Sequence, residues 1–385
     1  MSRKIRMGMV GGGPGAFIGN VHRIAARLDG EIELVCGSFS SNPDKSKETG
    51  KELNLPDDRV YDTFQDMIEK EKQLPEGERM DCISIVTPNH LHFLPAKLAL
   101  ENGFHVICDK PMTRTLDEAK ELEEIVNKTG LIFALTHTYT GYPMVKQARD
   151  MINEGTLGEI RKIYVEYPQG WLTEKVEETD SKQAGWRTDP SKSGIAGAMG
   201  DIGTHAENLA EYITGQKISK MCADLNTVVD GRVLDDDGAV LLKFDGGASG
   251  ILTASQVAAG EENSLAIRVY GTKAGLEWHQ MEPNSLQVKW LDQPMQVYRT
   301  GVGPLSEGAT AHTRVPAGHP EGYLEAFANL YRNFAKTIQA KIEGIDPDPQ
   351  HLDFPSVTDG VRGMQFLYKV VESGKSDQKW TDFDD

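Results

Sequence analysis

The sequence has little cysteine and no long apolar run. Its four cysteines show no C-x-x-C spacing and no Cys/His ligand pattern, which argues against both a disulfide framework and a structural zinc. No apolar stretch approaches the roughly 18 residues that a membrane-spanning helix needs. Because residues 2–4 are polar and lead directly into a strand pattern, we expect no signal peptide and a cytoplasmic protein.

Positive charge is scarce relative to negative charge. The chain has 41 Lys and Arg against 58 Asp and Glu, a formal net charge of −17. This balance disfavours nucleic acid and anionic membrane as partners and indicates a solvated acidic surface. The 385 residues exceed what one compact core usually holds, so we expect two domains.

Glycine, in contrast, is concentrated near the start of the chain. Residues 5–10 form an apolar strand pattern, and five of the next nine residues are glycine. The spacing Gly11-x-Gly13-x-x-Ala16 matches the dinucleotide-binding fingerprint, in which a glycine loop and a helix N-terminus hold a pyrophosphate. A tight strand-to-helix turn without a ligand is the alternative. The expected cofactor contacts in this loop are Gly11, Gly13, Pro14, Gly15 and Ala16.

The first third of the chain alternates strand and helix patterns. Strands are expected at residues 5–10, 32–39, 81–86, 104–108 and 131–136, with helices to about residue 28 and at 45–53, 64–71, 91–102 and 116–128. Repeated βα units of this kind predict a parallel sheet with helices on both faces. We therefore predict a Rossmann-type α/β domain over residues 1–137.

Ligands of such sheets bind beyond the carboxyl ends of the strands. The glycine loop, residues 87–92 and residues 109–111 each follow a predicted strand, so they converge on one crevice. The further cofactor contacts expected there are Thr87, Asn89, His90, Asp109 and Lys110.

The second strand lacks the acidic residue that usually binds the adenosine ribose hydroxyls. It runs instead into Ser40 and its polar neighbours, with Lys45 and Lys47 following. Serine can bond a ribose hydroxyl or line a 2′-phosphate site, so we favour NAD as the cofactor and do not exclude NADP.

Residues 138–385 have a different pattern of predicted helices and strands. Helices are expected at residues 144–154, 201–214, 323–342 and 360–373, with strands at 160–167, 239–244, 248–257, 265–270 and 286–290. Strands without intervening helices must be largely antiparallel, so this part is predicted to be an α+β domain. The polar stretch 168–200 has the length of a segment that covers a substrate.

Three residues are candidates for proton transfer. Lys110 follows a strand between an acid and a proline, where a partly desolvated amine can donate or accept a proton; its bond to Pro111 is a candidate cis peptide. Asp201 and His205 share one helix face if both are helical, and a carboxylate orients an imidazole. A capping box from Thr204 would instead begin the helix after Asp201. A surface lysine, a helix-start carboxylate and a satisfied histidine are the structural alternatives.

The remaining histidines do not form a metal-ligand pattern. His90 is expected beside the nicotinamide or its ribose, His92 in the first turn of a helix and His105 in a strand. His312, His319 and Asp353 give no ligand spacing, although a substrate contact from His319 stays open. We predict no metal.

Four motifs carry a resemblance to a known family. They are GMVGGGPGAFIGNVHR (8–23), TPNHLH (87–92), CDKPMTRTLDEA (108–119) and GDIGTHAENLAEYITG (200–215), followed by HPEGYLEAFANLYRNFA (319–335). In this order they resemble the Gfo/Idh/MocA family of NAD(P)-dependent sugar and cyclitol oxidoreductases, over nearly the whole chain. Asp109 stands where the family usually has glutamate, and Ser40 where many members have aspartate.

The resemblance implies a fold and a reaction. It implies an open, mostly antiparallel sheet in the second domain, a homodimer or homotetramer, and hydride transfer between nicotinamide and a secondary ring hydroxyl of a sugar, glycoside or inositol. The residues that it assigns to catalysis are Lys110, Asp201 and His205, with Trp186 and Arg187 near the cofactor. Lys110, Asp201 and His205 would also contact the substrate, and the additional sugar contacts that we expect are Tyr139, Tyr142, Trp171 and His319.

Other activities remain open at this point. One is a glycoside 3-dehydrogenase that retains NAD and starts a 3-keto route of glycoside cleavage. Another is an NAD-dependent glycoside hydrolase. A third is a non-catalytic sugar-nucleotide sensor, against which the intact set of Lys110, Asp201 and His205 argues.

Overall fold

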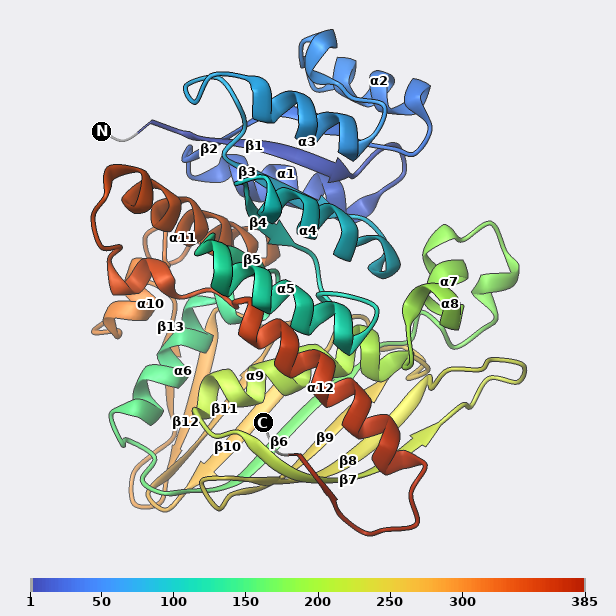
Figure 1. Cartoon of the computed structure of the whole chain (residues 1–385). Coiled ribbons are helices and arrows are strands. Elements are labelled where there is room, and N and C mark those ends of the chain that lie inside the picture. Colours follow the sequence, from blue (N-terminus) through green and yellow to red (C-terminus); the bar gives the residue numbers. More distant parts are fainter. Residues whose placement is uncertain (1–2, 384–385) are drawn as a thin grey trace. The chain divides into compact units, whose positions relative to one another are not determined.

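The computed structural model describes residues 3–383 and divides them into two compact units (Figure 1). Unit 1 comprises the chain up to Thr138 together with Tyr323–Val361. Unit 2 comprises Tyr139–Gly322 together with the chain from Arg362 onward. The sequence predicts one break at residue 137, whereas the chain returns to unit 1 at residue 323 and leaves it again after residue 361. Residues 323–361 therefore do not belong with the rest of the predicted second domain.

Unit 1 is built on a five-stranded parallel sheet in the order β2-β1-β3-β4-β5. The strands are β1 (Ile5–Gly11), β2 (Ile32–Ser38), β3 (Cys82–Val86), β4 (His105–Cys108) and β5 (Phe133–Leu135). Every residue of β3 and β4 is buried, as expected for strands covered on both faces. The predicted parallel Rossmann-type sheet is confirmed.

Helices cover both faces of this sheet (Figure 1). They are α1 (Phe17–Leu28), α2 (Pro43–Glu52), α3 (Phe64–Gln73), α4 (Phe93–Glu101), α5 (Leu116–Thr129) and α11 (Tyr323–Glu343), with short 3₁₀ turns η1 (Asp57–Arg59), η2 (Asn89–Leu91) and η6 (Pro349–Leu352). Helix α3 contacts α4 and α4 contacts α5, while α1 contacts α11. The right-handed connections of parallel strands account for α1 lying on one face and α3, α4 and α5 on the other.

Helix α11 joins unit 1 because one of its faces is aromatic. Phe327, Tyr331 and Phe334 recur at the spacing of a helix face and are fully buried. They pack in one cluster with apolar residues of β1 and α1. Burying a large side chain is worth about 1.5–3 kcal/mol, so three aromatic rings hold this late helix on the N-terminal unit.

Unit 2 contains a nine-stranded sheet in the order β13-β12-β11-β10-β6-β9-β8-β7-β14. The strands are β6 (Ile160–Pro168), β7 (Ile218–Asn226), β8 (Asp237–Phe244), β9 (Ser249–Ser255), β10 (Ala266–Gly271), β11 (Ala274–His279), β12 (Ser285–Trp290), β13 (Gln296–Arg299) and β14 (Thr381–Asp382). Its strand pairs are antiparallel except β6 and β9, which run parallel. The predicted mostly antiparallel sheet is confirmed.

Helices α6, α9 and α12 lie on the same side of this sheet (Figure 1). The helices of unit 2 are α6 (Pro143–Asn153), α7 (Lys182–Arg187), α8 (Pro190–Ser193), α9 (Thr204–Thr214), α10 (Glu307–Ala311) and most of α12 (Val357–Gly374), with η3 (Thr138–Gly141) at its start, η4 (Val176–Glu178) and a π-helical turn η5 (Met199–Gly203). Along β8, buried Val240, Leu242 and Phe244 alternate with exposed residues. Such alternation is typical of an antiparallel sheet with one solvated face.

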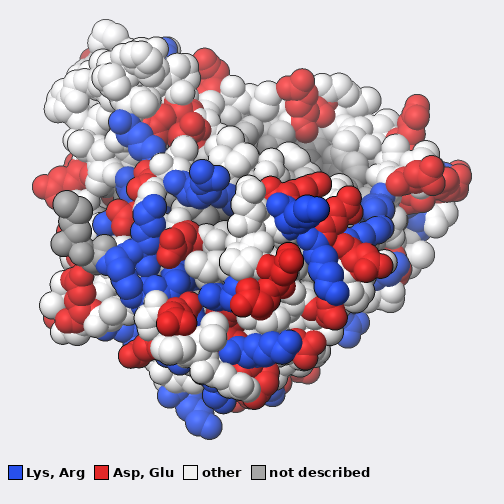
Figure 2. All heavy atoms as spheres, turned by 90° about the horizontal axis from the view of Figure 1, so that it is seen from above, with Lys and Arg blue, Asp and Glu red and all other residues white. Residues whose placement is uncertain are grey.

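The surface carries charge of both signs. Figure 2 shows Lys and Arg interspersed with Asp and Glu on the face in view. Across residues 3–383, no helix combines the length and the apolar character that crossing a membrane requires.

Candidate active site

The glycine loop after β1 depends on backbone conformations that glycine tolerates. Gly11, Gly12 and Gly15 have φ values of +88°, +77° and +77°. Residues with a Cβ rarely adopt this left-handed region. The loop therefore turns sharply out of β1, and no side chain at Gly11, Gly12 or Gly15 blocks the approach of a ligand to its backbone.

Helix α1 begins at Phe17 without a side-chain cap. Its N-cap is Ala16, which offers no side-chain hydrogen bond to the first turn. The first amide N–H groups of a helix have no partner within the helix, and together with the helix dipole they attract an anion. The glycine loop and this helix start thus present donors suited to a pyrophosphate.

Gly19 of helix α1 packs directly against the glycine loop. A Cβ on Gly19 would stand 2.3 Å from the Cα of Gly12, so only glycine allows α1 to approach the loop this closely. Close packing of this kind is the role of the third fingerprint glycine. Gly19, three residues after Ala16, therefore has the packing role of the third fingerprint glycine, and the match ending at Ala16 stays a prediction.

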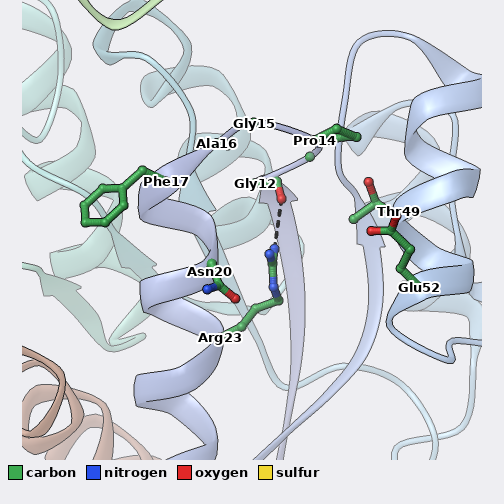
Figure 3. Close-up of a pocket in the computed structure, with 10 residues that line it drawn as sticks. Gly12, Pro14, Gly15, Ala16, Phe17, Asn20, Arg23, Thr49 and Glu52 are labelled. Carbon is green, nitrogen blue, oxygen red and sulfur yellow. Dashed lines mark hydrogen bonds between the residues drawn. The ribbon is translucent and has the colours of Figure 1, made fainter.

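A pocket of about 400 Å³ lies beside the loop (Figure 3). In this view the Arg23 guanidinium points toward the loop, and its Nη1 donates to the Gly12 carbonyl at 2.9 Å. Thr49 and Glu52 border the pocket from α2. The lining residues are Gly12, Gly13, Pro14, Gly15, Ala16, Phe17, Asn20, Arg23, Thr49 and Glu52.

Ser40 lies next to the loop. A Cβ on Gly13 would stand 2.7 Å from the Phe39 carbonyl oxygen and 3.5 Å from the Ser40 Cβ. The Ser40 Oγ accepts a hydrogen bond from the Asn42 amide at 3.2 Å. A serine hydroxyl therefore occupies the place at which the fingerprint expects a carboxylate.

The segments after β3 and β4 lie at the same edge of the sheet, because these strands are parallel neighbours. Thr87 follows β3, and its buried hydroxyl has no hydrogen-bond partner in the structure. Asn89 and His90 lie in η2. The Asp109 carboxylate accepts from the Lys110 amide and from the Thr136 hydroxyl, each at 2.9 Å. The bond from Lys110 to Pro111 is cis, as the sequence suggests.

A buried histidine interacts with Lys110. His137 follows β5, and burial lowers the pKa of its imidazole to about 3, with the Lys110 ammonium adding to this effect. His137 is therefore neutral at physiological pH. A neutral ring beside the Lys110 ammonium avoids the repulsion between two cations.

In unit 2, Asp201 lies in the π-helical turn η5, which continues directly into α9. No capping box forms at Thr204, whose hydroxyl instead donates to the Gly200 carbonyl at 3.1 Å. Asp201 and the buried His205 therefore belong to one continuous helical segment. Single π-turns of this kind are frequent at functional sites.

Two side chains hold the Asp201 carboxylate. Arg187 Nε donates to its Oδ2 at 3.0 Å, and Gln256 Nε2 donates to the same oxygen at 2.8 Å. The Arg187 guanidinium also lies over the rings of Trp186 and Trp171, at 4.2 and 5.8 Å from their centroids. Charge-assisted hydrogen bonds and cation–π contacts thus fix this carboxylate.

Aromatic rings surround His205. Its imidazole packs edge-on against Tyr139 with centroids 4.8 Å apart, and Tyr167 lies at 6.2 Å. The hydroxyls of the two tyrosines are hydrogen-bonded to each other, and both bond Asn263. Burial raises the pKa of the Tyr139 hydroxyl. Tyr139 therefore stays protonated and supports the imidazole by packing.

Three polar residues of this region carry no sequence motif. Gln169, Gln256 and Asn263 form a chain of hydrogen bonds, because Gln256 Nε2 donates to Gln169 Oε1 at 3.4 Å and Gln169 Nε2 donates to Asn263 Oδ1 at 2.7 Å. Gln256 also donates to Asp201. Gln169 also accepts from the Trp171 indole at 3.1 Å. Gln169 and Gln256 directly follow β6 and β9, whose parallel pairing brings their ends together. The positions of Gln169 and Gln256 after strands indicate a shared site only once the parallel pairing of β6 and β9 is known.

Two predicted sugar contacts lie in very different surroundings. The Tyr142 side chain is 2% exposed, and its ring packs against that of Trp278 at 5.4 Å in the core of unit 2. His319 is exposed, with its Nδ1 3.0 Å from the Pro316 carbonyl oxygen. Burial disfavours Tyr142 as a substrate contact, whereas His319 is accessible.

The other histidines have structural surroundings. The Nδ1 of His105 accepts the Ile132 amide at 2.9 Å, and burial lowers the pKa of this ring to about 4. His312 is buried, with Nδ1 2.7 Å from the Gly308 carbonyl oxygen. Within the part of the chain that the structure describes, no three His, Cys, Asp or Glu side chains gather as metal ligands.

Comparison with known proteins assigns the family. The family model described as "Oxidoreductase family, NAD-binding Rossmann fold" matches residues 5–137, and that of the GFO/IDH/MocA C-terminal domain matches residues 145–277. The chain belongs to the Gfo/Idh/MocA family. It is therefore an NAD-binding oxidoreductase of the sugar and inositol dehydrogenase type, which acts on CH–OH groups, and the predicted resemblance is confirmed.

Individual members of the family resemble the chain along its whole length. It is 33% identical to the uncharacterized oxidoreductase YfiI of Bacillus subtilis (strain 168), with 100% of this chain and 98% of that protein aligned. A solved oxidoreductase from Sinorhizobium meliloti is 45% identical, with a TM-score of 0.89 and coverage of 98% of this chain and 99% of that one.

An inositol dehydrogenase homolog from Azotobacter vinelandii is also similar. Its structure with NAD⁺ has a TM-score of 0.94 and 36% identity, and its structure with NADH and myo-inositol has a TM-score of 0.91 and 35% identity. Both cover 99% of this chain and 98% of that chain.

The loop geometry of this Gfo/Idh/MocA protein fits NAD. The positive φ of Gly11 and Gly12 and the uncapped start of α1 give a backbone surface that a pyrophosphate can approach. The Ser40 hydroxyl beside Gly13 can bond a ribose hydroxyl. These features of unit 1 agree with its assignment as the NAD-binding domain.

Proposed function

We propose that this protein oxidises a secondary ring hydroxyl of a cyclitol or a related sugar or glycoside, with NAD as the hydride acceptor. The observation that carries the proposal is the restrained Asp201 carboxylate, one helical turn before the buried imidazole of His205. A carboxylate held in this way stabilises an imidazolium, the product of proton abstraction from a hydroxyl. The similarity to an inositol dehydrogenase homolog that binds NADH and myo-inositol supports a cyclitol as the substrate.

The proposed chemistry assigns one role to each catalytic residue. His205 accepts the proton of the reacting hydroxyl, and Asp201 compensates the charge that the imidazole gains. Lys110 donates a hydrogen bond to the same oxygen and returns a proton to it in the reverse direction. When bound, the nicotinamide supplies the hydride acceptor, and the protein's contribution is placement.

Most of the proposed cofactor contacts belong to unit 1. The glycine loop and the start of α1 hold the pyrophosphate, Ser40 bonds the ribose, and the segments after β3 and β4 receive the nicotinamide side. The residues are Gly11, Gly13, Pro14, Gly15, Ala16, Ser40, Thr87, Asn89, His90, Asp109 and Lys110. Trp186 and Arg187 are the contacts proposed from unit 2, although Arg187 also serves Asp201.

The proposed substrate contacts are polar tips and aromatic faces. Gln169 and Asn263 carry amide groups suited to adjacent hydroxyls, and the Trp171 ring offers an apolar face for the sugar carbons. His319 is accessible for a further contact. We also propose a homodimer or homotetramer, in which the solvated face of the nine-stranded sheet would be covered.

A substrate panel tests the proposal. The purified protein is incubated with NAD and with inositols, hexoses and glucosides, while the absorbance of reduced nicotinamide is followed. We expect reduction with at least one inositol, and Lys110→Ala and His205→Ala each to lower kcat at least about 100-fold. Undiminished turnover in Lys110→Ala would contradict the assigned mechanism.

The two alternative activities give different results in this assay. A glycoside 3-dehydrogenase with retained NAD releases cofactor into the supernatant when the protein is denatured. Without added NAD, a glycoside reduces its bound cofactor only once per protein chain. A glycoside hydrolase releases an aglycone without net reduction of NAD. Either result, if no polyol reduces added NAD, would contradict the assignment as a simple dehydrogenase.

A further inference from the structure

His92 connects the two segments that follow β3 and β4. Its side chain is 1% exposed. Nδ1 lies 2.8 Å from the Pro111 carbonyl oxygen, and Nε2 lies 2.7 Å from the Thr87 carbonyl oxygen. One imidazole thus spans two loops of unit 1 that are 19 and 5 residues away from it along the chain.

Both partners of His92 are carbonyl groups, which only accept hydrogen bonds. A ring with a proton on each nitrogen satisfies both carbonyls, whereas a ring with one proton satisfies only one of them. An ionisable group that interacts electrostatically with His92 is His22 of α1, which also interacts with Asp109 after β4. Burial lowers the pKa of His22 to about 4, so His22 is neutral at physiological pH.

The segments that follow β3 and β4 are not paired with each other beyond the ends of these strands. The pairing of β3 with β4 ends at Ile85 and Cys108, and one more backbone bond runs from the Asp109 amide to the Ile85 carbonyl at 3.0 Å. Beyond this hydrogen bond the two segments form separate loops. The His92 ring lies across this divergence, where the sheet no longer fixes the distance between the loops.

The loops joined by His92 carry different proposed functions. Thr87 precedes Asn89 and His90, which are proposed cofactor contacts. Pro111 directly follows Lys110, the proposed proton donor. The hydrogen bond to Pro111 therefore acts on the catalytic lysine, and the bond to Thr87 acts on the cofactor loop.

We propose that His92 is a positioning residue whose two ring nitrogens fix the Lys110 segment relative to the cofactor-binding segment after β3. The inference rests on the proposed function, because it takes Lys110 as catalytic. Loss of the hydrogen bond to Pro111 should lower kcat, and loss of the hydrogen bond to Thr87 should raise the KM for NAD.

Two substitutions distinguish the hydrogen bond to Pro111 from the hydrogen bond to Thr87. The amide nitrogen of asparagine reaches about as far as Nδ1, and that of glutamine about as far as Nε2. His92→Asn therefore keeps a donor for Pro111, and His92→Gln keeps a donor for Thr87. His92→Ala removes both. His105→Asn is the matched control, since its amide oxygen can still accept the Ile132 amide just before the neighbouring strand β5.

We expect the kinetic parameters to divide between the variants. His92→Gln should lower kcat by about 10- to 100-fold, because Lys110 is misplaced, while the KM for NAD stays near that of the wild type. His92→Asn should raise the KM for NAD and the dissociation constant of NADH several-fold, with a smaller loss of kcat. His92→Ala should show both effects, and His105→Asn neither.

Hydrogen exchange of the holoprotein tests the same bonds without a substrate. We expect faster exchange of residues 109–113 in His92→Gln, of residues 87–91 in His92→Asn, and of both in His92→Ala. Equal kinetic losses and equal exchange in the two amide variants would overturn the proposal, as would unchanged exchange in His92→Ala. If the wild type lacks polyol activity, the proposed function fails, and the exchange data and NADH affinities still decide the role of His92.

Discussion

Gly19 of helix α1 lies directly against Gly12 of the loop after β1, so close that a Cβ at residue 19 would stand 2.3 Å from the Gly12 Cα. The obstacle is backbone, which cannot move aside as a flexible side chain could. The contact sets how near the uncapped start of α1 comes to the loop that we propose receives the pyrophosphate.

Gly19→Ala should therefore disturb the cofactor site. We expect the dissociation constant of NADH to rise at least about tenfold and the free energy of unfolding to fall by about 1–3 kcal/mol, the usual cost of overpacking. Fluorescence titration with NADH and urea unfolding measure the two effects. Gly77→Ala is the control, since a Cβ there meets nothing within 4 Å. Wild-type NADH affinity in Gly19→Ala would contradict this account of the loop.

Gln256 and Arg187 share the Asp201 carboxylate, so removing one donor should affect catalysis more than folding. We expect Gln256→Leu to lower kcat about tenfold or more, and to alter the pH profile of kcat/KM, because Asp201 no longer orients His205 in the same way. Steady-state rates from pH 6 to pH 9, roughly the range in which histidine and lysine titrate, check this. Gln287→Leu on β12 of the same sheet should behave like the wild type.

The site of Ser40 beside Gly13 makes cofactor preference testable. A carboxylate at this position bonds the ribose hydroxyls of NAD and repels the 2′-phosphate of NADP. We expect Ser40→Asp to shift the ratio of kcat/KM for NAD over that for NADP at least about tenfold toward NAD. The wild-type ratio, measured with the same substrate, is the reference. An unchanged ratio would mean that residue 40 does not face the ribose.

Much of unit 1 follows from local sequence patterns. Apolar runs followed by turn residues identify its strands, and the predicted parallel sheet depends only on their alternation with helices. The capping signal is less reliable: Thr115 and Glu118 form a capping box at α5, whereas Thr204 and Glu207 do not form one at α9. The preceding π-helical turn already continues the helix, so no cap is needed there.

Long-range pairing is what the sequence does not reveal. Nothing near Gln169 or Gln256 indicates that β6 and β9 are parallel neighbours. Two strands, β7 and β8, separate them along the chain in addition to helices, so they do not form a simple βαβ unit. The sequence likewise does not reveal that α11 packs on unit 1, because this contact joins distant segments of the chain. Its aromatic face at Phe327, Tyr331 and Phe334 predicts burial but does not name the partner. Contacts between distant segments must be observed.

Buried histidines should make the stability of unit 1 sensitive to acid. Burial lowers the pKa of His22 to about 4, of His105 to about 4 and of His137 to about 3. Between pH 6.5 and pH 4 the unfolded chain binds protons at these residues that the folded chain does not. Each therefore lowers the free energy of unfolding by up to about 1.4 kcal/mol per pH unit as the pH falls.

His22→Asn isolates one of these contributions. The His22 Nδ1 lies 2.6 Å from the Tyr331 hydroxyl, a bond that an asparagine amide can replace without a titratable ring. Urea unfolding at about pH 7, 6 and 5 should show a smaller loss of stability on acidification in His22→Asn than in the wild type. The exposed His319, changed to asparagine, should leave the pH slope unchanged. An equal slope in His22→Asn would mean that His22 binds a proton in the folded protein as readily as in the unfolded chain.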